Sequence, residues 1–150
     1  MFVRQGGNRV AEIEEFAHGY HYGDYSGVIF YGPPAGGVWP DRLAVSDCYI
    51  GPLFRGILSR AWRESGGERV PRLVSEWNAL KGWAAGSGPV PVTPADAVAF
   101  AEALARLGPA DVAGHCAGCT VEECLRCAAV VREFIGNRQA RGVSLFIKDD

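Results

Sequence analysis

The sequence predicts an α+β domain in which a small sheet of three or four strands packs with about four helices. Short apolar runs bounded by Gly and Pro fill the first fifty residues and are typical of strands. Apolar residues at helical spacing dominate the rest of the chain. A length of 150 residues with 48% hydrophobic residues fits one domain over residues 1–150 with a sizeable core.

The predicted strands come first. Residues 26–31 are apolar and lie between Gly-Asp and Gly-Pro-Pro, which favours a strand. Residues 43–50 predict another strand that ends at Gly51-Pro52. Residues 10–16 suit either a strand or a helix.

The middle of the chain predicts two helices. The first covers residues 53–62 and stops at Gly66-Gly67. The second begins at Pro71, where a missing N–H is harmless. Its expected apolar face is formed by Leu73, Val74, Trp77 and Leu80. We expect Trp62 to occupy a core position as well.

Thr93 caps a third helix, with Pro94 in its first position and Asp96 in its first turn. Val90-Pro91-Val92 precedes it in extended form, and Gly108-Pro109 ends it. A fourth helix follows the cysteines and carries Arg138 and Arg141 at its solvated end. Residues 143–147 predict a closing strand of the sheet.

Composition excludes several classes of protein. A net charge of −2 argues against a surface built for phosphate backbones. The N-terminal residues lack an apolar stretch of signal-peptide length, and no run approaches a membrane span. We therefore expect a soluble, cytoplasmic protein.

Four of the five cysteines fall within twelve residues, directly after His115. Two Cys-x-x-Cys pairs can converge on one metal ion, and their number and grouping fit metal or redox use better than a secreted disulfide framework. A straight helix would separate the first and last sulfur positions by about 16 Å, too far for one zinc with Zn–S bonds of about 2.3 Å. The predicted ligands of a structural zinc are Cys116, Cys119, Cys124 and Cys127.

The sequence also supplies the necessary break. Thr120 and Glu123 have the spacing of a capping box, which starts the helix at Val121. The first pair then lies in a loop, where Gly118 is free to take a positive φ. His115 is a substitute ligand or a hydrogen-bond donor to a thiolate.

Three other readings of the cysteines remain open: an iron–sulfur cluster, a disulfide or redox pair, and free thiols packed as small apolar side chains. Four thiolates around zinc leave no open position for water, so the site is expected to be structural. The fifth cysteine, Cys48, is expected in a core strand, apart from the others.

An aromatic segment with two histidines predicts a partner-binding surface. Its expected members are His18, Tyr20, His21, Tyr22, Asp24, Tyr25, Trp39 and Arg42. The same segment could instead bind a metal or act in acid–base chemistry through His18, His21 and Asp24.

The sequence lacks a phosphate loop, a nucleophile elbow and a His-Glu-x-x-His motif. We therefore expect a non-enzymatic protein-binding domain, such as an adaptor or an inhibitor of the immunity-protein kind, stabilised by a structural metal. One alternative is a small enzyme that uses the histidine segment. The other is a zinc-containing nucleic-acid-binding module that uses Arg126, Arg132, Arg138 and Arg141 on the last helix.

Overall fold

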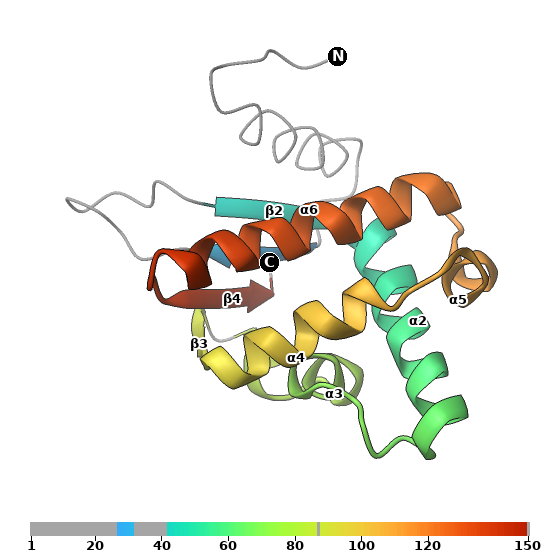
Figure 1. Ribbon diagram of the computed structural model, residues 1–150, viewed down its shortest axis with the longest axis horizontal. Coiled ribbons are helices and arrows are strands. Elements are labelled where there is room, and N and C mark those ends of the chain that lie inside the picture. Colours follow the sequence, from blue (N-terminus) through green and yellow to red (C-terminus); the bar gives the residue numbers. More distant parts are fainter. Residues whose placement is uncertain (1–26, 32–41, 87, 150) are drawn as a thin grey trace, which may run out of the picture.

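A computed structural model describes residues 27–31, 42–86 and 88–149. Within these ranges the chain is α+β, with four strands and five α-helices, which confirms the predicted fold class (Figure 1). The strands are β1 (Gly27–Tyr31), β2 (Arg42–Ser46), β3 (Val90–Val92) and β4 (Leu145–Asp149). The helices are α2 (Asp47–Ser65), α3 (Arg72–Ala79), α4 (Pro94–Ala105), α5 (Pro109–Val112) and α6 (Val121–Ala140), with short 3₁₀ turns η1 (Gly82–Ala85) and η2 (Ala113–His115).

The strands form one antiparallel sheet in the order β2-β1-β4-β3, so the last strand of the chain lies inside the sheet. Phe30 pairs with Leu43 on one side and with Ile147 on the other. Directly opposed residues share a face of a sheet, and all three of these side chains are fully buried. This face carries the hydrophobic core.

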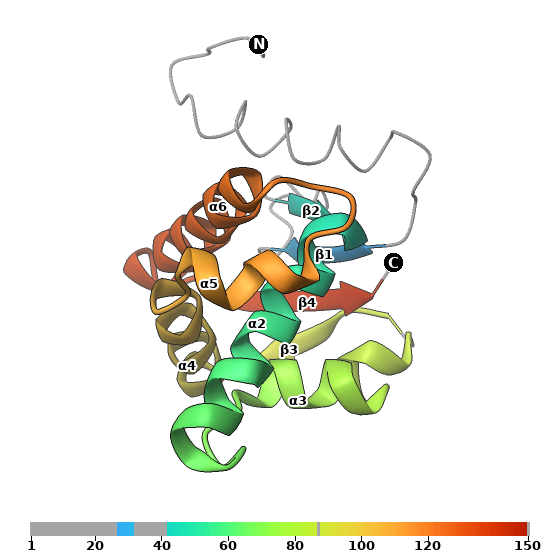
Figure 2. The ribbon, with the colours of Figure 1, turned by 90° about the vertical axis from the view of Figure 1, so that its right-hand side faces the viewer.

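The helices cover that face. Phe54 of α2 lies at the centre, with its ring centroid 5.1 Å from that of Trp77 and 5.4 Å from that of Phe100. Phe100 in turn stacks on Phe30, 6.2 Å away. Helices α4 and α6 pack side by side, and α2 crosses beside them (Figures 1 and 2). The predicted Thr93 cap is confirmed, since its side chain accepts from the Asp96 N–H at 3.1 Å.

The predicted strand over 43–50 is wrong in its second half. The strand ends at Ser46, whose side chain accepts a hydrogen bond from the Cys48 N–H and caps α2. Asp47 then lies in the first turn, where a negative charge favours the helix. Pro52 is accommodated inside the helix rather than ending a strand.

Three side chains also differ from expectation. Trp62 is 64% exposed rather than buried, because it lies on the outer side of α2 against the turn at Gly67. Leu80 is exposed because the helix has already ended, and its φ of 54° is left-handed.

Arg138 is buried with its guanidinium over the Phe134 ring, so it does not belong to a solvent-facing basic stripe. Trp83, in the turn η1 after α3, is fully buried, and its indole N–H donates to the Leu73 carbonyl at 2.9 Å.

Candidate metal centre

Three cysteines converge where the loop after η2 meets the start of α6. The Sγ atoms of Cys116, Cys119 and Cys124 all lie within 4.8 Å of one another. Cys116 and Cys119 are half-buried, and Cys124 is fully buried. Among the described residues this trio is the one group of three or more metal-ligating side chains at such distances, and it is a candidate metal site.

The capping box positions the trio. Thr120 Oγ1 accepts from the Glu123 N–H at 3.1 Å, and Glu123 Oε1 accepts from the Thr120 N–H at 2.9 Å. Both predicted hydrogen bonds are therefore confirmed, and α6 begins at Val121 as expected. The reversal at Thr120 brings Cys124, in the first turns of the helix, back toward the loop cysteines.

Gly118 has a role other than the predicted one. Its φ is not in the left-handed region, so the expectation of a positive φ is wrong. A Cβ atom at this position would instead lie 3.3 Å from the Cβ of Cys48, which is tighter than ordinary van der Waals contact. Glycine therefore allows the loop to approach α2 closely.

The backbone of Cys48 contacts this site, which the sequence analysis missed, although its thiol lies outside the group of three. Its carbonyl oxygen accepts a hydrogen bond from the Cys119 Sγ at 3.2 Å. In a regular helix that carbonyl would accept from the N–H four residues later, but Pro52 has none. The proline thus leaves an acceptor that the loop thiol uses. The Ser46-Asp47 capping pattern was the signal that Cys48 begins a helix and is not part of a strand.

Burial raises the pKa of three thiols at this site. Burial, with the neighbouring Cys116 and Cys48 thiols, raises the pKa of Cys119 to about 12. Burial is also the main cause that raises the pKa of Cys124 and of Cys127. A cation bound here must therefore displace thiol protons, as thiolate ligation requires.

The other predicted ligands lie nearby. Cys127 is one turn beyond Cys124 on α6, fully buried and outside the group of three, so its role as fourth ligand stays a prediction. His115 Nε2 lies 3.4 Å from Ser59 Oγ on α2, and His115 is likewise outside the group. All five cysteines are free thiols, and none forms a disulfide.

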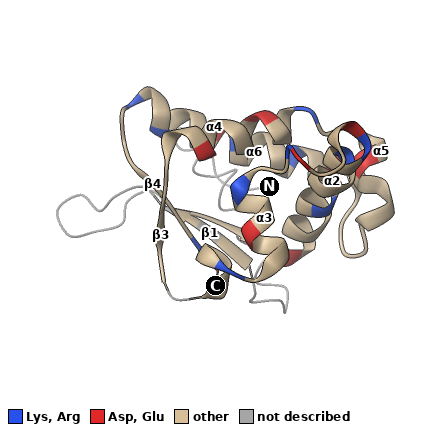
Figure 3. Cartoon of the chain, turned by 90° about the horizontal axis from the view of Figure 1, so that it is seen from below, with Lys and Arg blue, Asp and Glu red and all other residues tan. Residues whose placement is uncertain are grey.

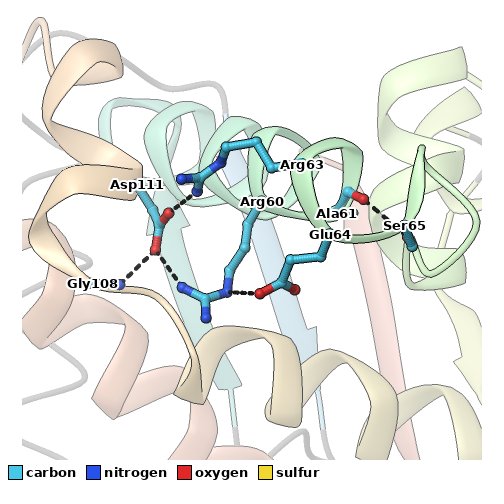
Figure 4. A network of polar contacts seen from close by, with 7 residues as sticks. All are labelled: Arg60, Ala61, Arg63, Glu64, Ser65, Gly108 and Asp111. Carbon is cyan, nitrogen blue, oxygen red and sulfur yellow. Dashed lines mark hydrogen bonds and ion pairs between the residues drawn. The ribbon is translucent and has the colours of Figure 1, made fainter.

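A second polar cluster fastens the other end of α2 (Figure 4). Asp111 is only 7% exposed and accepts from the Gly108 N–H at 2.8 Å and from Arg60 at 3.1 Å. Arg63 donates to its other oxygen. Burial is the largest single influence and raises the pKa of Asp111, but the Gly108 N–H and the two guanidiniums together outweigh it and hold that pKa below its usual range. The carboxylate is therefore ionised at neutral pH.

Most of the predicted partner-binding surface lies outside the described residues. These positions are His18, Tyr20, His21, Tyr22, Asp24, Tyr25 and Trp39. Arg42 is the first residue of β2, where only its backbone is described. Neither the partner-binding prediction nor the catalytic alternative for this segment is tested.

No protein family, no curated protein and no solved structure matches this chain. In the described part of the chain, no helix combines the length and apolar character needed to cross a membrane.

Proposed function

We propose that this chain is a non-enzymatic protein-binding domain, of the adaptor or immunity-type inhibitor kind, stabilised by a structural zinc ion. The observation that carries the proposal is the trio of thiols within 4.8 Å. Soft sulfur ligands select zinc, copper(I) or iron–sulfur clusters, and tetrahedral sulfur coordination is typical of structural zinc.

The position of the trio supports a structural role. Two of the cysteines lie in the loop and the third lies at the start of α6, so a bound ion would fasten the loop to this helix. With a fourth sulfur the ion has no open position for water or substrate, and its binding free energy would stabilise the fold.

An exposed tryptophan supports a role in binding another protein. Trp62 is 64% exposed, and the side chain of its neighbour Arg63 is 62% exposed. Trp and Arg are enriched among the residues that contribute most to the affinity of protein interfaces. This pair provides an anchor of the expected chemistry on the outer side of α2.

The metal part is tested by elemental analysis of protein purified without added metal. We expect about one zinc per chain, as a single four-sulfur site requires, and loss of the zinc in Cys116→Ser. Iron with visible absorption would redirect the proposal to an iron–sulfur protein. A wild-type chain that binds neither metal would refute a metal-stabilised fold.

The binding part is tested by crosslinking in the native host cell. We expect one stoichiometric protein partner, and Trp62→Ala should weaken its binding by about 30-fold, the effect of one hot-spot residue. Leu80→Ala is the matched control, since Leu80 is also exposed but lies elsewhere. A chain that stays monomeric and turns over a small molecule would contradict the proposal, as would binding to nucleic acid that weakens steeply with salt.

A further inference from the structure

We propose that Cys48 supplies the fourth sulfur of the metal site, so that the ion joins the start of α2 to the start of α6. This inference rests on the proposed metal site and identifies its remaining ligand. The trio provides three sulfurs, and tetrahedral zinc needs a fourth at about 2.3 Å from the ion. The chain has two further cysteines, Cys48 and Cys127.

Contacts place Cys48 against the loop that carries two of the ligands. The Cys119 Sγ atom lies 3.2 Å from the Cys48 carbonyl oxygen. The Cys48 Cβ atom lies 3.3 Å from where a Cβ at Gly118 would stand. The side chain of Cys48 therefore starts beside the trio, and Gly118 is the residue that lets the loop come this close.

The helix termini favour Cys48 as a charged ligand. Cys48 is the second residue of α2, with its N–H bonded to Ser46 Oγ, and so lies in the positive first turn. Cys127 is the seventh residue of α6, beyond the turn where the helix dipole acts. A thiolate is stabilised at a helix N-terminus, and this effect falls off after the first turn.

The two candidates also differ in exposure. Cys127 has no exposed surface and packs in the hydrophobic core with Ala128 and Val131 of the same helix. Cys48 is half-buried, as are the two loop cysteines. Cys124 of the trio is as buried as Cys127 and lies in the same cluster, so the choice between Cys48 and Cys127 rests on the contacts of Cys48 with the loop and on its place at a helix start.

The proposed ligand set is thus Cys48, Cys116, Cys119 and Cys124. Each ligand loses its thiol proton to solvent when the ion binds, and Cys119 then no longer donates to the Cys48 carbonyl. The ion replaces that hydrogen bond by two metal–sulfur bonds that join positions 71 residues apart in the chain. One ion would therefore fix the first turn of α2 against the loop and the first turns of α6.

The ligands can be identified directly in the full-length wild-type chain loaded with NMR-active cadmium. A cadmium–proton correlation spectrum shows couplings from the ion to the Cβ protons of each coordinating cysteine. We expect couplings to Cys48 and to the trio. Couplings to the trio without Cys48, with or without Cys127, would overturn the inference but leave the proposed metal site intact. A chain that binds neither zinc nor cadmium would refute the metal site itself.

A matched pair of variants provides a second readout. Cys48→Ser should lower zinc affinity by at least about tenfold, the lower range for losing a group that supports a metal site. Cys127→Ala also removes one thiol outside the trio. Because Cys127 is not a ligand in the proposed set, this variant should change the zinc affinity by less than about threefold. Affinity is measured by competition with a chromophoric chelator, and circular dichroism verifies that each variant is folded. The reverse order of effects would assign the fourth position to Cys127.

Discussion

The two ends of α2 are fastened to the same segment, residues 108–119, by different chemistry. At the C-terminal end, Arg60 and Arg63 bind the buried carboxylate of Asp111. At the N-terminal end, the contact is a thiol–carbonyl hydrogen bond from Cys119 to Cys48. Charged residues of both signs lie along α2 and around α5, as Figure 3 shows.

The difference lies in how complete each attachment is by itself. The Asp111 carboxylate already has three donors, so the charged end is formed by the polypeptide alone. At the cysteine end the thiols lie close together, and the hydrogen bond from Cys119 to the Cys48 carbonyl is weak because sulfur is a poor donor. We infer that the cysteine end reaches its full strength only with a bound ion, while the charged end depends on pH.

The largest expected effect is the loss of metal from the cysteine end. At free zinc about 1,000-fold above the Kd, binding stabilises the native state by about 4 kcal/mol. A strong chelator should therefore lower the free energy of unfolding of the wild-type chain by about that amount, measured by urea denaturation. Cys116→Ser should respond to neither zinc nor the chelator. A wild-type chain that holds zinc but unfolds at the same urea concentration after chelation would contradict a structural role.

The charged end should give a smaller, pH-dependent effect. Asp111→Asn removes the charge but keeps an acceptor for the Gly108 N–H, and we expect a loss of about 1–3 kcal/mol at neutral pH. The native pKa of Asp111 is lowered, so its contribution is present above the unfolded value of about 3.9 and is lost as the pH falls through the native pKa. Urea denaturation at several pH values should therefore show the wild-type and variant curves converging below about pH 4. Parallel curves would show that Asp111 contributes through packing rather than charge.

The smallest effect compares two glycines on either side of the first loop cysteine. A Cβ at Gly118 would press on Cys48, whereas a Cβ at Gly114 would meet nothing within 4 Å. Gly114→Ala should therefore stabilise the chain by about 0.4–1 kcal/mol through the unfolded state. In Gly118→Ala the close contact with Cys48 should cancel this stabilisation. The free energies of unfolding of the two variants should therefore differ by about 1 kcal/mol, measured by thermal or urea unfolding. Equal stabilities would mean that the loop moves freely away from α2.

Local sequence signals predicted the starts of α4 and α6 correctly. The caps at Thr93 and Thr120 act through hydrogen bonds within three residues, so spacing alone reveals them. The same local reasoning failed between Ser46 and Pro52. There an apolar run suited either a strand or a helix, and a proline was interpreted as a terminator although it lies inside α2.

Local sequence patterns could not predict contacts between residues that are far apart in the chain. Spacing grouped four cysteines but placed the fifth in a separate strand, because nothing local links Cys48 to a loop 71 residues later. Trp62 and Arg138 were misjudged for a related reason. Helical periodicity gives the relative angle of side chains on a helix, but which arc faces the core depends on the neighbouring elements.

The sequence by itself determined the fold class, the caps of α4 and α6 and the thiol chemistry available near the C-terminus. These follow from short-range hydrogen bonding, apolar periodicity and the identity of the donor atoms. The tertiary structure decided that Cys48 lies beside the loop that carries Cys119, and that a carbonyl left without a helical partner by Pro52 receives the Cys119 thiol. That outcome required α2 to pack against residues 108–119, and packing across such a separation is set by the shape of the whole core.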